Sequence, residues 1–477
     1  MRTAYSVETV RAAERELMAR LPEGALMQRA AAGLAAVCAG LLGRVYGARV
    51  VLLVGAGDNG GDALYAGARL ARRGAGVTAV PADPERVHGG GLRALLAAGG
   101  RVERAVPGRA DLVLDGLVGI GGRGGLRPAA AALVERIPAG APVVAVDLPS
   151  GVDADTGEVA GAAVHADVTV TFGAYKPGLL IDPGASRTGA LRLVDIGLSL
   201  PDPDAEALQH ADVAELLPAP AASSDKYRRG VVGVLAGSAQ YPGAAVLAVA
   251  GALRGGAGAV RYVGPAADAV LARYPETLIG RGRVQAWVVG PGLGEGRAAE
   301  VAEALADPVP VLVDADGLRG LDPQVLRARP AETLLTPHAG EAAALLGTSR
   351  EAVEAARLSS VRTLAARYGA TALLKGSTTL VARPGGGPVR VNPTGTAWLA
   401  TAGSGDVLSG LAGSLLASGL TGADAASVAA YVHGLAGRRA AAGAPLHAQQ
   451  IAEFLPEAWR DIREEARYRT GRGSHRA

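Results

Sequence analysis

Short apolar runs rich in valine and leucine alternate along the chain with longer stretches in which apolar residues recur at helical spacing. Residues 7–43 predict two helices, and the run at 49–54 predicts the first buried strand. Further strands are expected at 77–80, 112–114, 143–146 and 168–172, with helices at 63–73 and 128–136 between them. Such alternation is typical of a parallel sheet covered by helices on both faces.

The alternation stops between about residues 199 and 224, where prolines occur together with aspartate and serine. This texture indicates a linker, with a short helix expected at about 205–217. Beyond it, strands are expected at 231–235, 286–289, 309–313 and 334–336, a strand pair at 370–375 and 378–381, a helix at 244–254, and three closing helices, the last at 448–467. We therefore predict two α/β domains, residues 1–218 and 219–477, with a loose polar tail after Tyr468.

Composition narrows the class of protein. Hydrophobic residues make up 49% of the 477 residues, so large cores can be buried, while the 3% of aromatic residues argues against base-stacking nucleic-acid modules. The single cysteine, Cys38, excludes an internal disulfide and a multi-cysteine metal site, and we expect it to be buried on a helix. The first residues lack a signal-peptide pattern, and charges such as Arg29 and Arg254 interrupt the apolar stretches. We therefore expect no membrane span and a cytoplasmic location.

The most informative stretch is Gly403-Ser404-Gly405-Asp406, which stands directly before the apolar run 407–411. Small residues before a helix make a turn whose amides and helix dipole can bind an anion. A carboxylate repels phosphate, so Asp406 fits best as a base that takes a proton from a hydroxyl while the amides hold the phosphoryl group. An N-cap aspartate on an ordinary helix explains the pattern alone equally well.

Residues 55–60 match the G-x-G-x-x-G pattern between a strand and a helix, which commonly indicates a dinucleotide-binding turn. Asp58 and Asp62 would repel a pyrophosphate in such a turn. Carboxylates and an amide in a glycine turn suit a hard cation better, because that ion needs oxygen ligands at close approach. The alternative is a tight turn with a purely structural role.

Two further strand ends in the first half carry acids. Asp115 leads into the glycine-rich loop 116–125, and Asp147 leads into the turn 148–151. Because ligands bind beyond the carboxyl ends of strands in open α/β sheets, Asn59, Asp115 and Ser150 can converge on one cation while Asp147 faces a ligand. A single aspartate after a strand is often structural, but several in one sheet form a more specific signal.

The first half resembles the YjeF N-terminal family of NAD(P)H-hydrate epimerases over most of residues 8–215, through the motifs GDNGGD, LDGLVGIGGRG, VDLPSGVDADTG and TFGAYKPG. The resemblance implies potassium (K⁺) bound by Asn59, Asp115 and Ser150. It also implies that the hydrated nucleotide contacts Asp58, Asn59, Gly60, Gly61, Asp62, Gly119, Ile120, Gly121, Gly122, Arg123, Gly124, Gly125 and Asp147. Asp58 stands where asparagine is usual and Ala63 where glycine is usual, and Asp58 adds a charge near the ligand.

Three more turns at expected strand ends lie in the second half. They are 290–294 (GPGLG), 336–341 (TPHAGE) and 375–379 (KGSTT). The ammonium, hydroxyls and amides of the last turn suit phosphate oxygens. Taken singly, His338 fits a helix-start residue with a satisfied ring and Lys375 a solvated turn. Four such turns ending in GSGD are harder to explain as scaffold alone.

This half resembles the YjeF C-terminal family, the ADP/ATP-dependent NAD(P)H-hydrate dehydratases with a ribokinase-like fold, over about residues 225–465. The remaining motifs are GSAQYPGAAVLAVAGALRGGAGAV, DADGL and NPTGTAWLATAGSGDVLSG. The resemblance implies an adenine nucleotide, ADP or ATP with Mg²⁺, bound by Lys375, Gly376, Ser377, Thr378, Thr379 and Gly405. It implies that Gly292, His338 and Asp406 bind the hydrate, with Asp406 as catalytic base. Residues 397–399 depart from the usual small residues, and Ser404 replaces a common threonine.

Together the halves predict an α/β protein with an N-terminal Rossmann-like αβα sandwich and a C-terminal ribokinase-like domain that repairs hydrated NAD(P)H. The first domain would exchange the R and S epimers, with Asp147 as its acid/base residue, and the second would dehydrate the S epimer. The expected partners are small molecules, not nucleic acid or membrane, in a homo-oligomer of undetermined size. A ribokinase-like kinase for a vitamin precursor explains GSGD equally well but not the first half. A nucleotide-sensing scaffold would leave the first domain inert.

Overall fold

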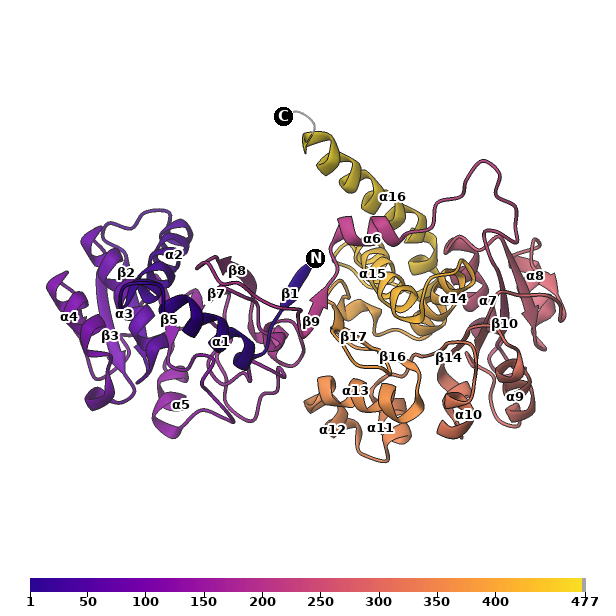
Figure 1. Ribbon diagram of the computed structural model, residues 1–477, viewed down its shortest axis with the longest axis horizontal. Coiled ribbons are helices and arrows are strands. Elements are labelled where there is room, and N and C mark those ends of the chain that lie inside the picture. Colours follow the sequence, from indigo (N-terminus) through magenta and orange to yellow (C-terminus); the bar gives the residue numbers. More distant parts are fainter. Residues whose placement is uncertain (474–477) are drawn as a thin grey trace. The chain divides into compact units, whose positions relative to one another are not determined.

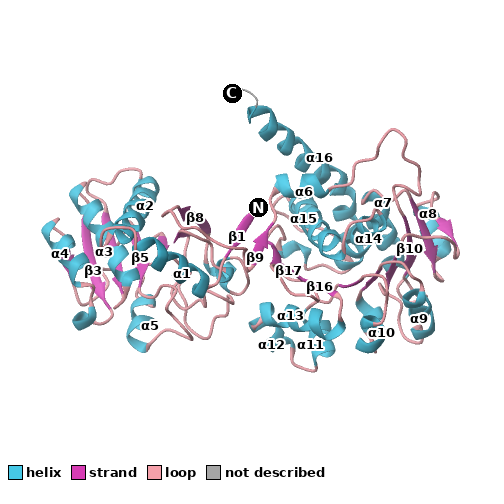
Figure 2. Ribbon diagram, in the orientation of Figure 1, coloured by secondary structure: helices cyan, strands magenta, loops and turns pink. Residues whose placement is uncertain are grey.

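The computed structural model describes residues 1–473, with side chains through residue 465, and it divides into two compact units. One unit comprises residues 3–205, and the other comprises residues 1–2 and everything from residue 206 onward. Two short strands, β1 (Arg2–Ala4) and β9 (Ala205–Ala207), contain the residues at which the chain passes between the units. Each unit is an α/β structure with its own sheet (Figure 1; Figure 2).

The sheet of the first unit is parallel throughout. Its strands run in the order β4 (Arg101–Val102), β3 (Gly76–Pro81), β2 (Arg49–Val54), β5 (Leu112–Gly116), β6 (Val143–Val146), β7 (Val168–Phe172) and β8 (Ala190–Val194). The helices are α1 (Val7–Met18), α2 (Ala25–Leu42), α3 (Asp58–Arg72), α4 (Gly89–Ala97) and α5 (Pro128–Val134).

Strand β2 shows why this unit has helices on both faces. Val50, Leu52 and Val54 belong to the core shared with α2 and α3, whereas Val51 and Leu53 belong to the core shared with α5. Successive side chains of a strand point to opposite faces, so a strand covered on both faces must be apolar at every position. The continuous apolar run in the sequence therefore places β2 in the middle of the sheet.

The second unit has a mixed sheet in the order β18 (Val389–Asn392), β17 (Thr379–Ala382), β16 (Thr371–Leu374), β15 (Thr333–Leu335), β14 (Val311–Val313), β13 (Ala286–Val289), β10 (Val231–Leu235), β11 (Ala259–Val263) and β12 (Leu278–Ile279). The strands from β16 to β12 are parallel, while β17 pairs antiparallel with β16 and β18. The β16–β17 strand pair expected from the sequence is thus confirmed.

Helices cover both faces of this sheet (Figure 1). One group comprises α6 (His210–Leu216), α7 (Pro242–Arg254), α8 (Ala267–Arg273), α14 (Ser404–Ala417), α15 (Gly422–Ala441) and α16 (Ala448–Gly473). The other comprises α9 (Ala298–Ala306), α10 (Pro323–Arg327), α11 (Ala339–Leu346), α12 (Arg350–Ala355) and α13 (Arg357–Tyr368). The carboxyl ends of β13 to β16 open toward the first turn of α14.

Several boundaries differ from the sequence-based expectation. The helix expected at about 205–217 is strand β9 followed by α6, which begins at His210. Helix α3 begins at Asp58 rather than residue 63, because the glycine turn itself forms the first helical turn. The units divide at 205/206 rather than near 218, since Leu208, Val213 and Leu217 are buried in the core of the second unit. Helix α16 extends to Gly473, so the expected loose tail after Tyr468 is helical as far as it is described, and residues 474–477 lie outside the described residues.

Helix α2 also differs from expectation. By length and composition it qualifies as a membrane span, because Arg29 is its single charge, whereas the sequence reading placed no such segment in the chain. In the structure Leu34, Ala35 and Cys38 are buried in the core beneath it. Since core helices of α/β domains pass the same composition test, this helix alone is weak support for a membrane location. The buried position of Cys38 on a helix is confirmed.

Candidate active sites

The first turn of α14 lies over the carboxyl ends of the parallel strands in the second unit. Gly403 precedes it in a left-handed conformation (φ 86°), which a residue with a β-carbon rarely adopts. The helix is held close to α7 and the sheet, because a β-carbon at Gly410 would lie 1.9 Å from the carbonyl oxygen of Ala248. This packing fixes the direction of the helix and places Asp406 in its first turn.

A cavity of about 850 Å³ opens beside Asp406. Two of the residues expected to contact the hydrate, Gly292 and Asp406, line it. The complete lining is Gln240, Tyr241, Pro242, Gly243, Ala244, Leu247, Gly292, Gly294, Glu295, Asp316, Arg319, Ala402, Gly403 and Asp406. A cavity of this volume accommodates a substrate of nucleotide size.

Asp406 has the electrostatic character of a base that works near neutral pH. Burial, followed by the negative charge of Asp314, raises the pKa of its carboxyl to about 7, although the ammonium of Lys375 opposes both effects. A carboxyl with a pKa near the working pH can take up a proton and release it again. The alternative of a simple N-cap is not supported, since no side-chain cap hydrogen bond forms at this helix start.

Lys375 lies at the centre of the charged groups below the α14 turn. Its ammonium is 2.7 Å from Asp314 Oδ1 and 3.7 Å from Glu341 Oε2. Burial lowers the pKa of Lys375, but Asp314 and Glu341 outweigh burial and the net pKa is raised. A β-carbon at Gly405 would lie 3.5 Å from Lys375 Nζ, so the structure brings these two predicted nucleotide residues together.

Two residues that the sequence analysis missed support this region. The buried guanidinium of Arg357 donates hydrogen bonds to the carbonyl oxygens of Leu374, Lys375 and Thr378, and so holds the KGST turn. The buried ring of His433 lies 3.0 Å from the carbonyl oxygen of Ser404, and burial lowers its pKa to about 4, which leaves it a neutral donor. Neither residue stands in a turn motif, so the sequence contains no local signal for them.

Of the three residues predicted to bind the hydrate, His338 is the one that does not line the cavity. Its Nδ1 accepts hydrogen bonds from the backbone amides of Gly340 and Glu341, and the His338 amide donates a hydrogen bond to Glu341 Oε2. These contacts form a capping box at the start of α11. The helix-start alternative weighed in the sequence analysis therefore describes its contacts.

In the first unit, Asp115 and Ser150 meet at the ends of neighbouring segments. Asp115 is fully buried and accepts hydrogen bonds from Ser150 Oγ at 2.6 Å and from the Ser150 amide at 2.8 Å. Burial raises the pKa of Asp115 to about 6, against the lowering effect of these hydrogen bonds. The buried Asn59 side chain packs against Gly119, and its Nδ2 has no partner among the described residues.

The glycine turn of this unit serves packing as well as any ligand. A β-carbon at Gly60 would lie 2.3 Å from the carbonyl oxygen of Gly55, so these two glycines permit the close turn from β2 into α3. Asp58 is exposed, Asn59 and Asp62 are buried, and the loop from Gly121 to Gly125 is largely exposed. A purely structural role of the turn therefore explains Gly55 and Gly60. It does not explain why the polar residues Asn59 and Asp62 are buried.

Asp147 forms a buried ion pair. Its Oδ1 lies 2.5 Å from the ammonium of Lys176, which is only 1% exposed. Thr171 Oγ1 also donates to Oδ1, at 3.1 Å. Asp147 has a left-handed backbone (φ 67°), which is strained for a residue with a side chain and is tolerated mainly at functional positions.

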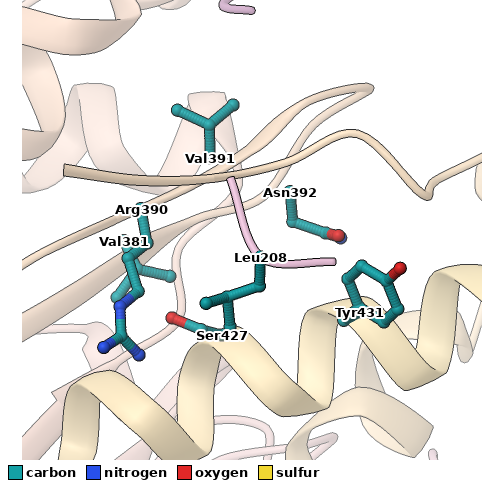
Figure 3. A pocket seen from close by; sticks show the side chains of 7 residues that line it. All are labelled: Leu208, Val381, Arg390, Val391, Asn392, Ser427 and Tyr431. Carbon is teal, nitrogen blue, oxygen red and sulfur yellow. The ribbon is translucent and has the colours of Figure 1, made fainter. Parts of the chain in front are cut away.

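A second, much smaller cavity lies between β17, β18 and α15 in the second unit (Figure 3). Its volume is about 10 Å³, which suffices for about one water molecule. The residues around it are Leu208, Val381, Arg390, Val391, Asn392, Ser427 and Tyr431. It is a packing defect beside the first segment of the unit and not a substrate site.

Comparison with known proteins connects both sites to one family. A family model described as NAD(P)H-hydrate dehydratase matches residues 232–457, and one described as YjeF-related protein N-terminus matches residues 23–178. The chain is 52% identical to the bifunctional NAD(P)H-hydrate repair enzyme of Mycobacterium leprae, over 93% of this chain and 95% of that protein. It is 37% identical to the enzyme of the same name from Corynebacterium glutamicum, over 96% of this chain and 98% of that protein.

Among solved structures, the ADP/ATP-dependent NAD(P)H-hydrate dehydratase of Bacillus subtilis, co-crystallised with ATP and Mg²⁺, is similar to the second half. It is 28% identical, with a TM-score of 0.50, and the match covers 53% of this chain and 97% of that chain. This likeness confirms the fold expected for the second half. From the sequence relationship over nearly its whole length, the chain belongs to the family of bifunctional NAD(P)H-hydrate repair enzymes.

Proposed function

We propose that the unit from residue 206 onward dehydrates the S epimer of hydrated NAD(P)H with ADP or ATP, and that the unit of residues 3–205 exchanges the R and S epimers. Asp406 carries this proposal: its pKa is raised to about 7, it lines a cavity of about 850 Å³, and it lies in the first turn of α14 next to Lys375. Membership of the bifunctional repair family supports both activities.

The chemistry of dehydration explains why a base and an anion site belong together. The hydrate has a hydroxyl on C6 of its ring, and hydroxide is a poor leaving group. Asp406 takes the hydroxyl proton as the oxygen attacks the terminal phosphoryl group of the nucleotide, and the amides of the α14 turn stabilise the negative charge. The ring nitrogen lone pair then expels phosphate, and loss of a proton from C5 restores the ring double bond.

The nucleotide phosphates are assigned to Lys375, Gly376, Ser377, Thr378, Thr379 and Gly405. The short approach of Gly405 to the Lys375 ammonium supports this assignment. Mg²⁺ would come with the phosphates, because the described residues contain no cluster of three metal-binding side chains, and Mg²⁺ usually shares phosphate oxygens with one or two carboxylates. Glu295 and Asp316, which line the cavity, are suitable carboxylates.

Potassium is assigned to Asn59, Asp115 and Ser150. The residues fit such an ion: the fully buried Asp115 carboxylate has no cation partner among the described residues, and Asn59 and Ser150 are buried residues whose side chains carry neutral oxygen atoms. One carboxylate with neutral oxygen ligands balances a monovalent charge better than a divalent one. Bound K⁺ would supply charge that keeps Asp115 ionised.

One assay tests both activities on the full-length chain. The purified S epimer of hydrated NADH with ADP and Mg²⁺ should regain the absorbance of reduced nicotinamide, and without nucleotide it should only convert to the R epimer, as followed by chromatography. Replacing K⁺ by Li⁺ should slow the epimer exchange and leave dehydration unchanged. A chain that transfers phosphate stably to a vitamin precursor and leaves the hydrate untouched would be a ribokinase-like kinase instead.

Two further properties belong to the same proposal. We propose a cytoplasmic location, because the proposed substrates are small soluble nucleotides, and neither proposed reaction needs a nucleic-acid or membrane partner. A homo-oligomer is the proposed assembly, and sedimentation of the full-length chain tests it. Neither property changes the chemistry assigned to the two sites.

A further inference from the structure

The first unit contains a buried carboxyl group that no contact explains. Asp62 in the second turn of α3 is only 8% exposed, and its Oδ1 has no hydrogen-bond partner among the described residues. A buried polar group without a partner is costly, so a fold retains it where a ligand or a reaction uses it. Its position on α3 places it on the helix that follows β2, next to β5 and β6 in the sheet.

The charged groups facing Asp62 come from three directions. Asp147 follows β6, Asp58 precedes Asp62 on α3, and Glu14 lies on α1. Burial raises the pKa of Asp62 well above its usual range, and the charges of Asp147, Asp58 and Glu14 raise it further in that order. Glu14 shows the same direction: burial raises its pKa, although Lys176 opposes that effect. All four effects favour the protonated form of the Asp62 carboxyl.

Asp147, unlike Asp62, has several hydrogen-bond donors around it. Lys176 Nζ, Thr171 Oγ1 and the amide of Phe172 all donate to its Oδ1, and the first of these donors is a cation. No described residue donates to Oδ2, which leaves that oxygen available to a ligand. Asp62 lacks a hydrogen-bond partner and Asp147 is paired with a cation, and two neighbouring carboxyl groups in such different environments are the arrangement that enzymes use for an acid and a base.

We propose that Asp62 and Asp147 are the general acid and general base that open and close the ring of the hydrate during epimer exchange. The proposal rests on the epimerase function assigned above to this unit. Asp147 Oδ2 takes the proton of the C6 hydroxyl, and Asp62 donates a proton to the ring nitrogen. This gives the Asp62 carboxyl a role that its burial without a partner requires.

The step balances without any oxidant or further reactant. The O–H bond breaks, and its electron pair forms the second bond of a C6 aldehyde. The bond between C6 and the ring nitrogen breaks, and its pair goes to the nitrogen, which receives the proton of Asp62. Rotation about the bond next to the aldehyde presents its other face, and the reverse steps then close the ring to the opposite epimer, with both protons returned.

The test uses the full-length chain without nucleotide, so that epimer exchange is the one reaction observed. Asp62→Asn keeps the shape of the side chain but cannot donate an acidic proton, and it should lower the exchange rate about 10²–10⁴-fold. Asp111→Asn is the matched control, because Asp111 forms an exposed ion pair with Arg49 in the same unit, and it should leave the rate unchanged. Exchange by Asp62→Asn at the wild-type rate overturns the assignment.

Stability and isotope measurements separate the possible outcomes. Asp62→Asn should melt at or above the wild-type temperature, because it removes a buried carboxyl; a large drop would indicate a structural role and count against the proposal. For the wild type in H₂¹⁸O, ring opening predicts that the C6 oxygen is retained, whereas one ¹⁸O incorporated per exchange shows loss of the hydroxyl and overturns the ring-opening step. Absence of any exchange by the wild type would instead refute the epimerase function itself.

Discussion

At the scale of single residues, the burial that suits Asp406 to its proposed role as a base also opposes stability near neutral pH. Burial holds a proton on its carboxyl up to about pH 7, whereas in the unfolded chain that proton leaves near the ordinary aspartate value. Between these two pH values the unfolded state ionises and the folded state does not. The contribution of Asp406 to stability is therefore full at acid pH and is lost as the pH rises to about 7.

Asp406→Asn tests both consequences in one variant. The dehydration rate should fall about 10²–10⁴-fold, because the general base is gone, while epimer exchange in the other unit should remain. The melting temperature of the ligand-free variant should exceed that of the wild type by an amount that grows from about pH 4 to about pH 7 and is constant above. A variant with normal dehydration would contradict the base assignment.

Lys375 should influence both the nucleotide and the base. Lys375→Ala should raise the KM for ADP more than the KM for the hydrate, because a phosphate-facing ammonium is lost. It should also move the pH midpoint of dehydration upward, since Lys375 lowers the pKa of Asp406. Steady-state kinetics across pH measure both effects.

Lys226→Ala is the matched control for Lys375→Ala. Lys226 is an exposed lysine of the same unit that lies over the ring of Tyr227, away from the residues assigned to the nucleotide. This variant should keep both KM values and the pH midpoint. An equal loss of affinity for both ligands in Lys375→Ala would point to misfolding around Asp314, which loses its ion pair.

The residue scale also shows how far sequence reasoning reaches. Asp406 and Lys375 could be predicted because they stand in short turn motifs whose chemistry is local. Arg357 and His433 act through backbone carbonyls that are 17 to 29 residues away along the chain, and only the fold creates those contacts. His338 also stands in a turn motif, but its Nδ1 accepts a backbone hydrogen bond that caps α11. Its proposed contact with the hydrate remains a prediction.

At the scale of elements, the close contact between α7 and α14 fixes the position of the helix that carries Asp406. Gly410 faces the Ala248 carbonyl at a distance that leaves no room for a methyl group. Gly410→Ala should destabilise the second unit by about 1–3 kcal/mol through overpacking, despite the better helix propensity of alanine. Denaturant unfolding followed by circular dichroism measures this change, and dehydration should weaken with it because Asp406 shifts.

Gly40→Ala is the control for Gly410→Ala. Gly40 lies on α2, and a β-carbon there would meet nothing within 4 Å. The same substitution should therefore stabilise the first unit by up to about 1 kcal/mol, as propensity alone predicts. If both substitutions changed the stability of their units in the same direction, the close approach of α7 and α14 would not be the reason for glycine at position 410.

The elements themselves were largely predictable. Buried parallel strands are continuous apolar runs, and β2, β6, β7, β10 and β13 have the predicted bounds. The predicted start of α3 at residue 63 was wrong, because glycines usually disfavour a helix. Here the close approach of Gly60 to Gly55 makes glycine necessary in the first turn. Strands β8 and β11 have mixed burial and fewer signals, and the sequence reading missed them.

At the scale of the whole molecule, the two sites belong to separate compact units with separate hydrophobic cores. The sequence placed the division near 218 because prolines mark that segment. Contacts of Leu208 and Val213 with the second core move it to 205/206, and such contacts are not visible in composition. The residues assigned to each site lie within one unit, so we expect neither reaction to require residues of the other unit.

This separation predicts that two full-length variants, each with one inactive site, complement each other in solution. Asp406→Asn alone should exchange the epimers of hydrated NADH and form no NADH. Asp147→Asn alone, with ADP and Mg²⁺, should consume the S epimer and leave the R epimer apart from its slow spontaneous exchange. A mixture of both should convert all of the hydrate, because the epimer released by one chain diffuses to the other, and absorbance at completion measures this yield. If the mixture leaves as much R epimer as Asp147→Asn alone, the epimers pass between sites without release, and the two units do not act as independent enzymes.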